Sequence, residues 1–215
     1  MFRMFMSLVC LTMCLGQPAK AHPHVFVDAN TGFIFDKARR LTGLRISWTY
    51  DEFTTLVLFE TLNLDRDGDG IFNDEDRAAV VKGETNWDRE YKGDIYFDVA
   101  GKNYPLGRPK SGKAKLEDGK ITVSFDLPLS QPHDLSGSPA ILRLYDPSYY
   151  YAYAILPNQR FQNLPKGCQA QINTFKADAT TQALQKELSA LSREEVPTQQ
   201  NVGQLFSDEV RLSCE

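Results

Sequence analysis

Two histidines that flank a proline, His22 and His24, are the side chains of this sequence best suited to bind a transition metal. They directly follow Ala19-Lys20-Ala21, which has the Ala-x-Ala pattern of a signal-peptidase cleavage site. Cleavage there would leave His22 with a free α-amine of ordinary pKa, about 7.7, so its amine and imidazole could chelate a metal at neutral pH. Pro23 has no amide proton, which excludes a chelate through the second and third backbone nitrogens. The predicted site therefore combines the His22 amine and imidazole, the His24 imidazole and a donor from elsewhere.

Three residues are candidates for that remaining donor. His133, the third histidine of the chain, stands in a polar loop after a predicted strand and would contribute only if that loop folds back. Asp51 and Glu52 offer carboxylates that could bind the metal or orient the histidines, although acids are also favoured at a helix start. Imidazole-rich sets suit zinc, nickel, cobalt or copper better than calcium or magnesium. The sequence predicts one transition-metal ion, and the alternative is a frayed terminus with incidental histidines.

A second metal site is predicted in the acidic segment 65–76. Its acids stand at loop positions 1, 3, 5 and 12 and Gly70 at position 6, which is the order of an EF-hand calcium loop. Position 12 carries an aspartate in place of the usual glutamate, which favours weak calcium binding or magnesium. Because the sequence has no second loop to pair with it, a structural ion is favoured over a switch. The expected ligands are the side chains of Asp65, Asp67, Asp69 and Asp76 and the carbonyl oxygen of Ile71.

The first 21 residues have the composition of a secretory signal peptide: a basic start, a short apolar stretch and the cleavage site. The remaining 194 residues suffice for one domain, and no direct membrane insertion of the mature chain is expected. Cleavage removes two basic residues and no acid, leaving 22 basic and 28 acidic side chains and a net charge of about −6. This charge argues against nucleic acid as a partner. Cys10 and Cys14 leave with the leader, so Cys168 and Cys214 are expected to form a disulfide in an oxidising compartment.

Hydrophobic periodicity predicts an α+β fold: a single β-rich, antiparallel sandwich-like domain over residues 22–215. An EF-hand-like helix–loop–helix is inserted at 51–88, and residues 176–215 form a C-terminal helix with a disulfide-tied tail. Thr49 and Glu52 are predicted to form the capping box of a helix that runs to about Asn63. Two further helices are expected at 75–82 and 180–192, followed by a polar loop. Predicted strands cover 25–35, 44–49, 94–99, 121–127, 141–145, 149–155 and 169–175.

Four short motifs of the chain are His22-Pro23-His24-Val25, Asp51-Glu52-Phe53, Tyr145-Asp146-Pro147-Ser148-Tyr149-Tyr150 and Gly167-Cys168. Together they resemble a bacterial family known as domain of unknown function 1007. The resemblance implies an exported protein of the periplasm that accompanies a nickel/cobalt-type membrane permease. It covers most of residues 22–175 and does not include His133.

Our leading hypothesis is a periplasmic transition-metal-binding protein that works with a membrane metal permease or transporter, without enzymatic activity. A second hypothesis is a copper-dependent oxidase or monooxygenase, because an N-terminal histidine chelate resembles the site of copper polysaccharide monooxygenases. A third is a calcium-stabilised interaction domain that docks through the tyrosines of residues 145–153. Those tyrosines also have a structural explanation, since aromatic residues are favoured in strands.

Overall fold

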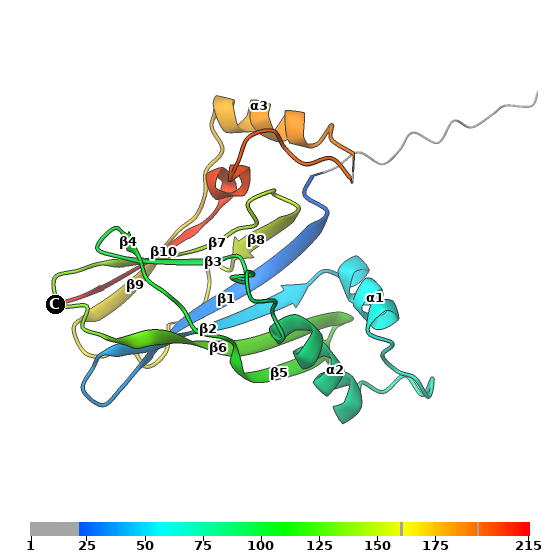
Figure 1. Cartoon of the computed structure of the whole chain (residues 1–215), viewed down its shortest axis with the longest axis horizontal. Helices are drawn as coiled ribbons and strands as arrows, with labels where there is room; N and C mark the ends of the chain where they lie inside the picture. Colours follow the sequence, from blue (N-terminus) through cyan, green and yellow to red (C-terminus); the bar gives the residue numbers. More distant parts are fainter. Residues whose placement is uncertain (1–21, 160, 193) are drawn as a thin grey trace, which may run out of the picture.

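Two five-stranded sheets form the body of the protein in a computed structural model, which describes residues 22–159, 161–192 and 194–215 (Figure 1). The first sheet has the order β5-β6-β2-β1-β8 and the second the order β4-β3-β7-β10-β9. Neighbouring strands pair antiparallel except β1 and β8, which are parallel. The first sheet contains β1 (Val25–Phe35), β2 (Leu41–Tyr50), β5 (Lys110–Glu117), β6 (Lys120–His133) and β8 (Tyr151–Ile155). The second contains β3 (Ile95–Val99), β4 (Lys102–Asn103), β7 (Ala140–Leu144), β9 (Cys168–Asn173) and β10 (Glu209–Cys214).

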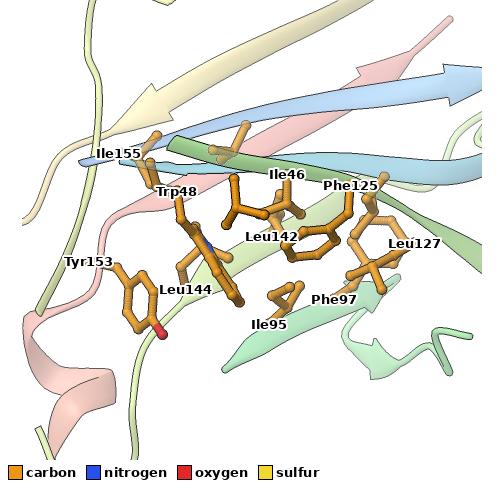
Figure 2. Packing of buried hydrophobic residues seen from close by; sticks show 14 of the residues in the cluster. Ile46, Trp48, Ile95, Phe97, Phe125, Leu127, Leu142, Leu144, Tyr153 and Ile155 are labelled. Carbon is orange, nitrogen blue, oxygen red and sulfur yellow. The ribbon is translucent and has the colours of Figure 1, made fainter. Parts of the chain in front are cut away.

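The core lies between the facing sides of the two sheets. Along β6, buried and half-buried residues alternate from Lys120 to Leu129, as expected for a strand with one face against a core. In Figure 2, Ile46, Trp48 and Phe125 from the first sheet face Phe97 and Leu142 from the second. The predicted β-rich sandwich with antiparallel pairing is therefore confirmed, with one parallel pair added.

Two helices connect β2 to β3: α1 (Glu52–Thr61) and α2 (Asp74–Thr85). They lie on the side of the sandwich formed by β5 and β6 (Figure 1). The predicted Thr49–Glu52 capping box is wrong, because Asp51 is the N-cap and its Oδ1 accepts the amide of Thr54 at 2.7 Å. Thr49 remains in β2, where its hydroxyl bonds that of Thr122. β2 thus runs one residue further than predicted before α1 begins. An aspartate caps a helix as well as a threonine does.

The C-terminal segment is more ordered than the predicted loop and tail. It forms α3 (Ala179–Leu188), a short 3₁₀ helix η1 (Val202–Phe206) and β10, which lies between β7 and β9. Val210 and Leu212 on β10 are fully buried, so this strand belongs to the core. Cys168 and Cys214 face each other across β9 and β10 and form the predicted disulfide. No helix in the described part of the chain is long and apolar enough to cross a membrane.

Candidate metal centres

The two N-terminal histidines lie together where β1 begins. The ring centroids of His22 and His24 are 4.8 Å apart, and the rings meet nearly edge to face. His22 is buried, with 4% of its surface exposed, and its Nδ1 has no hydrogen-bond partner among the described residues. The Nε2 atom of His24 is also buried. A buried imidazole nitrogen without a protein partner loses its hydration uncompensated, so this arrangement is expected to need a water molecule or a metal ion.

Tyr150 forms one wall of this histidine pair. Its ring centroid lies 4.8 Å from that of His24 and 6.0 Å from that of His22. Its carbonyl oxygen accepts the backbone amides of His24 at 2.9 Å and Val25 at 3.2 Å. The start of β1 is thereby tied to the loop before β8, which argues against the alternative of a frayed terminus at His24.

Asp146 organises the loop that presents Tyr150. Its carboxylate accepts the amides of Ser148, Tyr150 and Tyr151 at 3.0, 2.7 and 3.1 Å, together with the Ser148 hydroxyl. Within this loop Tyr149 adopts a left-handed conformation with φ of 60°. One half-buried carboxylate therefore fixes the loop on which the histidines pack, a role that the sequence motif did not reveal because it depends on loop conformation.

Of the three candidate donors, only Asp51 is brought close to the histidines. Its Oδ2 accepts the amide of Phe26 at 3.3 Å, two residues after His24. Glu52 is exposed and forms an ion pair with Lys120 at 3.3 Å; its own backbone amide and then Lys120 lower the pKa of its carboxyl. His133 pairs with Leu41 at the opposite end of β2, about 30 Å away along the strand. The structure therefore places His133 far from the histidine pair and Glu52 in an ion pair with Lys120.

The acidic loop 65–76 joins α1 to α2, as an EF-hand loop joins its helices. Carboxylate oxygens of Asp65, Asp67 and Asp69 lie within 4.8 Å of one another, a separation that one calcium or magnesium ion can bridge. Gly70 takes a φ of 74° at the turn and donates its amide to Asp65. Three converging carboxylates therefore fit a hard divalent cation.

Asp76 has a different position from the one the EF-hand pattern predicts. Its two carboxylate oxygens accept the amides of Asp65 and Asn73, each at 2.9 Å, and it forms a capping box with Asn73 at the start of α2. It does not join the other three carboxylates. An aspartate is one methylene shorter than the usual glutamate. From position 12 its carboxylate therefore contacts the loop backbone and not the other three carboxylates. Ile71 has an exposed side chain, and its carbonyl stays an expected ligand.

Comparison with known proteins identifies the family. The family model described as "Protein of unknown function (DUF1007)" matches residues 7–214. The chain belongs to the DUF1007 family. A relative from Haemophilus influenzae, described as an uncharacterized protein, is 26% identical over 198 residues, covering 91% of this chain and 92% of the relative. The family resemblance drawn from the motifs is confirmed. The match extends over both candidate metal centres of this DUF1007 protein and, at its N-terminal end, over part of the expected signal peptide, which lies outside the described residues.

An Asp67→Asn substitution tests the acidic loop. Asp67 is exposed and, unlike Asp65 and Asp69, accepts no hydrogen bond from the backbone of the described loop, so its loss should lower calcium affinity by about tenfold or more without unfolding the loop. Calcium at 100 times its dissociation constant should stabilise the wild type by about 2.7 kcal/mol and the variant less. Titration calorimetry and thermal unfolding measure both effects. Glu75→Gln, an exposed acid next to the group, should behave as the wild type; equal losses in both variants would mean general charge rather than a site.

Proposed function

We propose that this DUF1007 protein is a periplasmic transition-metal-binding protein that passes its ion to or from a membrane metal transporter. The observation that carries the proposal is the His22–His24 pair, with a buried His22 Nδ1 that has no partner among the described residues. Imidazole nitrogens suit zinc, nickel, cobalt and copper. The ion is cargo, so the protein acts as a carrier rather than as an enzyme.

The donors proposed for the ion are the imidazoles of His22 and His24 and, after cleavage behind Ala21, the α-amine of His22. Asp51 is the nearest candidate among the acids, since it bonds the backbone two residues beyond His24. It also caps α1, which fixes its carboxylate and disposes it to orient the site rather than to move with the ion. Tyr150 covers the pair on one side and limits access of water.

The periplasm is proposed as the compartment on two grounds. The disulfide between Cys168 and Cys214 requires an oxidising environment to persist. The leader-like residues 1–21 supply an export signal of the usual composition. The acidic loop is proposed to hold calcium or magnesium as a structural ion, separate from the cargo site.

The exposed side of α1 supports a protein partner close to the histidines. Phe53 and Leu56 expose 73% and 68% of their surfaces, and Phe26 exposes 56%. Asp51 links these residues, because it caps α1 and also bonds the amide of Phe26. Large apolar side chains grouped on a surface commonly mark an interaction site. A transporter docked there would stand next to the proposed cargo site.

Native mass spectrometry of the exported protein, purified without chelator, tests the proposal. The expected result is a chain that begins at His22 and carries one transition-metal ion beside one calcium-type ion. A chain with that N-terminus and no affinity for zinc, nickel, cobalt or copper would contradict the cargo role and favour a calcium-stabilised interaction domain. Turnover of peroxide by the copper-loaded protein would instead favour the oxidase.

A further inference from the structure

A polar pocket that is distinct from both metal centres opens between the C-terminal end of α2 and the inner face of the first sheet. Its volume is about 210 Å³, room for about seven water molecules at roughly 30 Å³ each. Six aromatic side chains and one half-buried acid, Glu84, line it together with exposed Asn86 and Asp88. The six aromatic residues are Trp48, Tyr50, Trp87, Tyr91, Tyr151 and Tyr153.

Glu84 in this pocket and Asp94 behind its wall have hydrogen-bond partners that are neutral. Glu84 accepts a hydrogen bond from the Tyr50 hydroxyl. Asp94, buried behind the pocket wall, accepts the hydroxyls of Tyr153 at 2.9 Å and Tyr91 at 3.2 Å. Among the described residues, neither carboxylate takes part in an ion pair with a lysine or arginine. The two carboxylates are therefore surrounded by aromatic side chains, and no lysine or arginine of the described chain neutralises them.

Burial makes these acids costly to keep ionised. It raises the pKa of Glu84, although the Tyr50 hydroxyl opposes the shift. It also raises the pKa of Asp94 to about 6, with Tyr153 and Tyr91 opposing and the charge of Asp146 adding to the shift. A positive ligand would relieve this cost, and aromatic faces attract organic cations in addition.

We propose that this pocket binds a small organic cation. Its ammonium group would lie between the aromatic side chains and the Glu84 carboxylate. The chemical class is that of small amines and their methylated forms. None of the lining residues belongs to the histidine pair or to the acidic loop, so the inference is independent of the metal-carrier proposal.

Intrinsic fluorescence provides a direct test, because both tryptophans of the chain line this pocket. Choline and ethanolamine, added in amine-free buffer, should change the emission saturably. The uncharged carbon isostere of choline, dimethylbutanol, should not. Glu84→Gln should weaken choline binding by about tenfold or more, as expected for loss of a charged partner. Asp118→Asn, which removes an exposed acid from the turn between β5 and β6, serves as the matched control.

Tetramethylammonium, which carries the charge and no oxygen, should bind as choline does, because the proposed contacts are with the cation. Equal responses to choline and dimethylbutanol would overturn the inference in favour of simple apolar filling. No response to any of these probes by folded wild-type protein would mean that water alone occupies the pocket.

Discussion

A His24→Phe variant of the mature protein is expected to lose transition-metal affinity by more than about a hundredfold and to keep its fold. Phenylalanine preserves a ring against Tyr150, whose centroid lies 4.8 Å from that of His24, but it removes both nitrogen donors. Loss of groups that only orient a ligand already costs roughly 10- to 100-fold, so loss of the ligand should cost more. Competition titrations against a chromogenic zinc chelator, repeated with nickel, cobalt and copper, measure the change.

The chain supplies its own control in His133→Phe. His133 packs against Tyr104 at 5.1 Å and lies at the far end of the sheet, so this substitution should leave metal affinity unchanged. Calcium binding should be the same in both variants, because the acidic loop shares no residue with the histidine pair. A matching loss in His133→Phe, or an unaltered affinity in folded His24→Phe, would refute the site.

The same titration distinguishes the α-amine of His22 from its imidazole as metal ligands. A chain that begins at His22 has both an α-amine and an imidazole, whereas a chain that retains Ala21 has only the imidazole. If the amine is a ligand, the longer chain binds more weakly, and His22→Phe binds more weakly still. Identical binding by the two chains would leave the imidazoles as the only donors.

Local patterns predicted those parts of the fold whose side chains alternate clearly. β1, β2 and β6 bury every second residue, and their periodicity is visible in the sequence. β5 was missed because three lysines interrupt its pattern: Lys110, Lys113 and Lys115. It is an edge strand, where lysines discourage pairing with other chains. β10 was missed although Val210 and Leu212 alternate with charged residues, because its burial depends on distant β7 and β9.

The candidate sites divide in the same way. The acidic loop and the His22–His24 pair are local in sequence, so spacing alone predicted that their side chains would meet. The role of Asp146 and the pocket around Glu84 could not be predicted from spacing. Asp146 acts through the conformation of its loop, and the pocket combines residues from β2, β8 and the end of α2. Asp51 had two plausible roles and Asp76 was expected only as a ligand; the backbone geometry shows that Asp51 caps α1 and that Asp76 completes the capping box of α2 with Asn73.

Asp146 is expected to act as a positioning residue for the metal site, and Asp146→Asn should lower transition-metal affinity by about 10- to 100-fold. The substitution removes one of the two oxygens that hold the amides of Ser148, Tyr150 and Tyr151. With Tyr150 released, both the ring beside the histidines and the carbonyl that bonds the His24 amide would shift. Stability should also fall, by about 1 kcal/mol, because half-buried amides lose their acceptor.

Two companion variants distinguish positioning from general destabilisation. Ser148→Ala removes a hydroxyl from the same carboxylate but keeps all three amide bonds, so metal affinity should stay near that of the wild type. Gly203→Ala disturbs the loop from η1, since an added Cβ would lie 1.9 Å from the Asp146 carbonyl oxygen, and it should weaken metal binding as Asp146→Asn does. Titrations run well below the unfolding temperature of each variant keep the comparison among folded proteins. Reduced stability of Asp146→Asn with an unchanged metal dissociation constant would show that the loop supports the fold alone. An equal loss of transition-metal affinity in Asp146→Asn and Gly203→Ala, with calcium affinity intact, would show that residues 146–151 position the histidine pair.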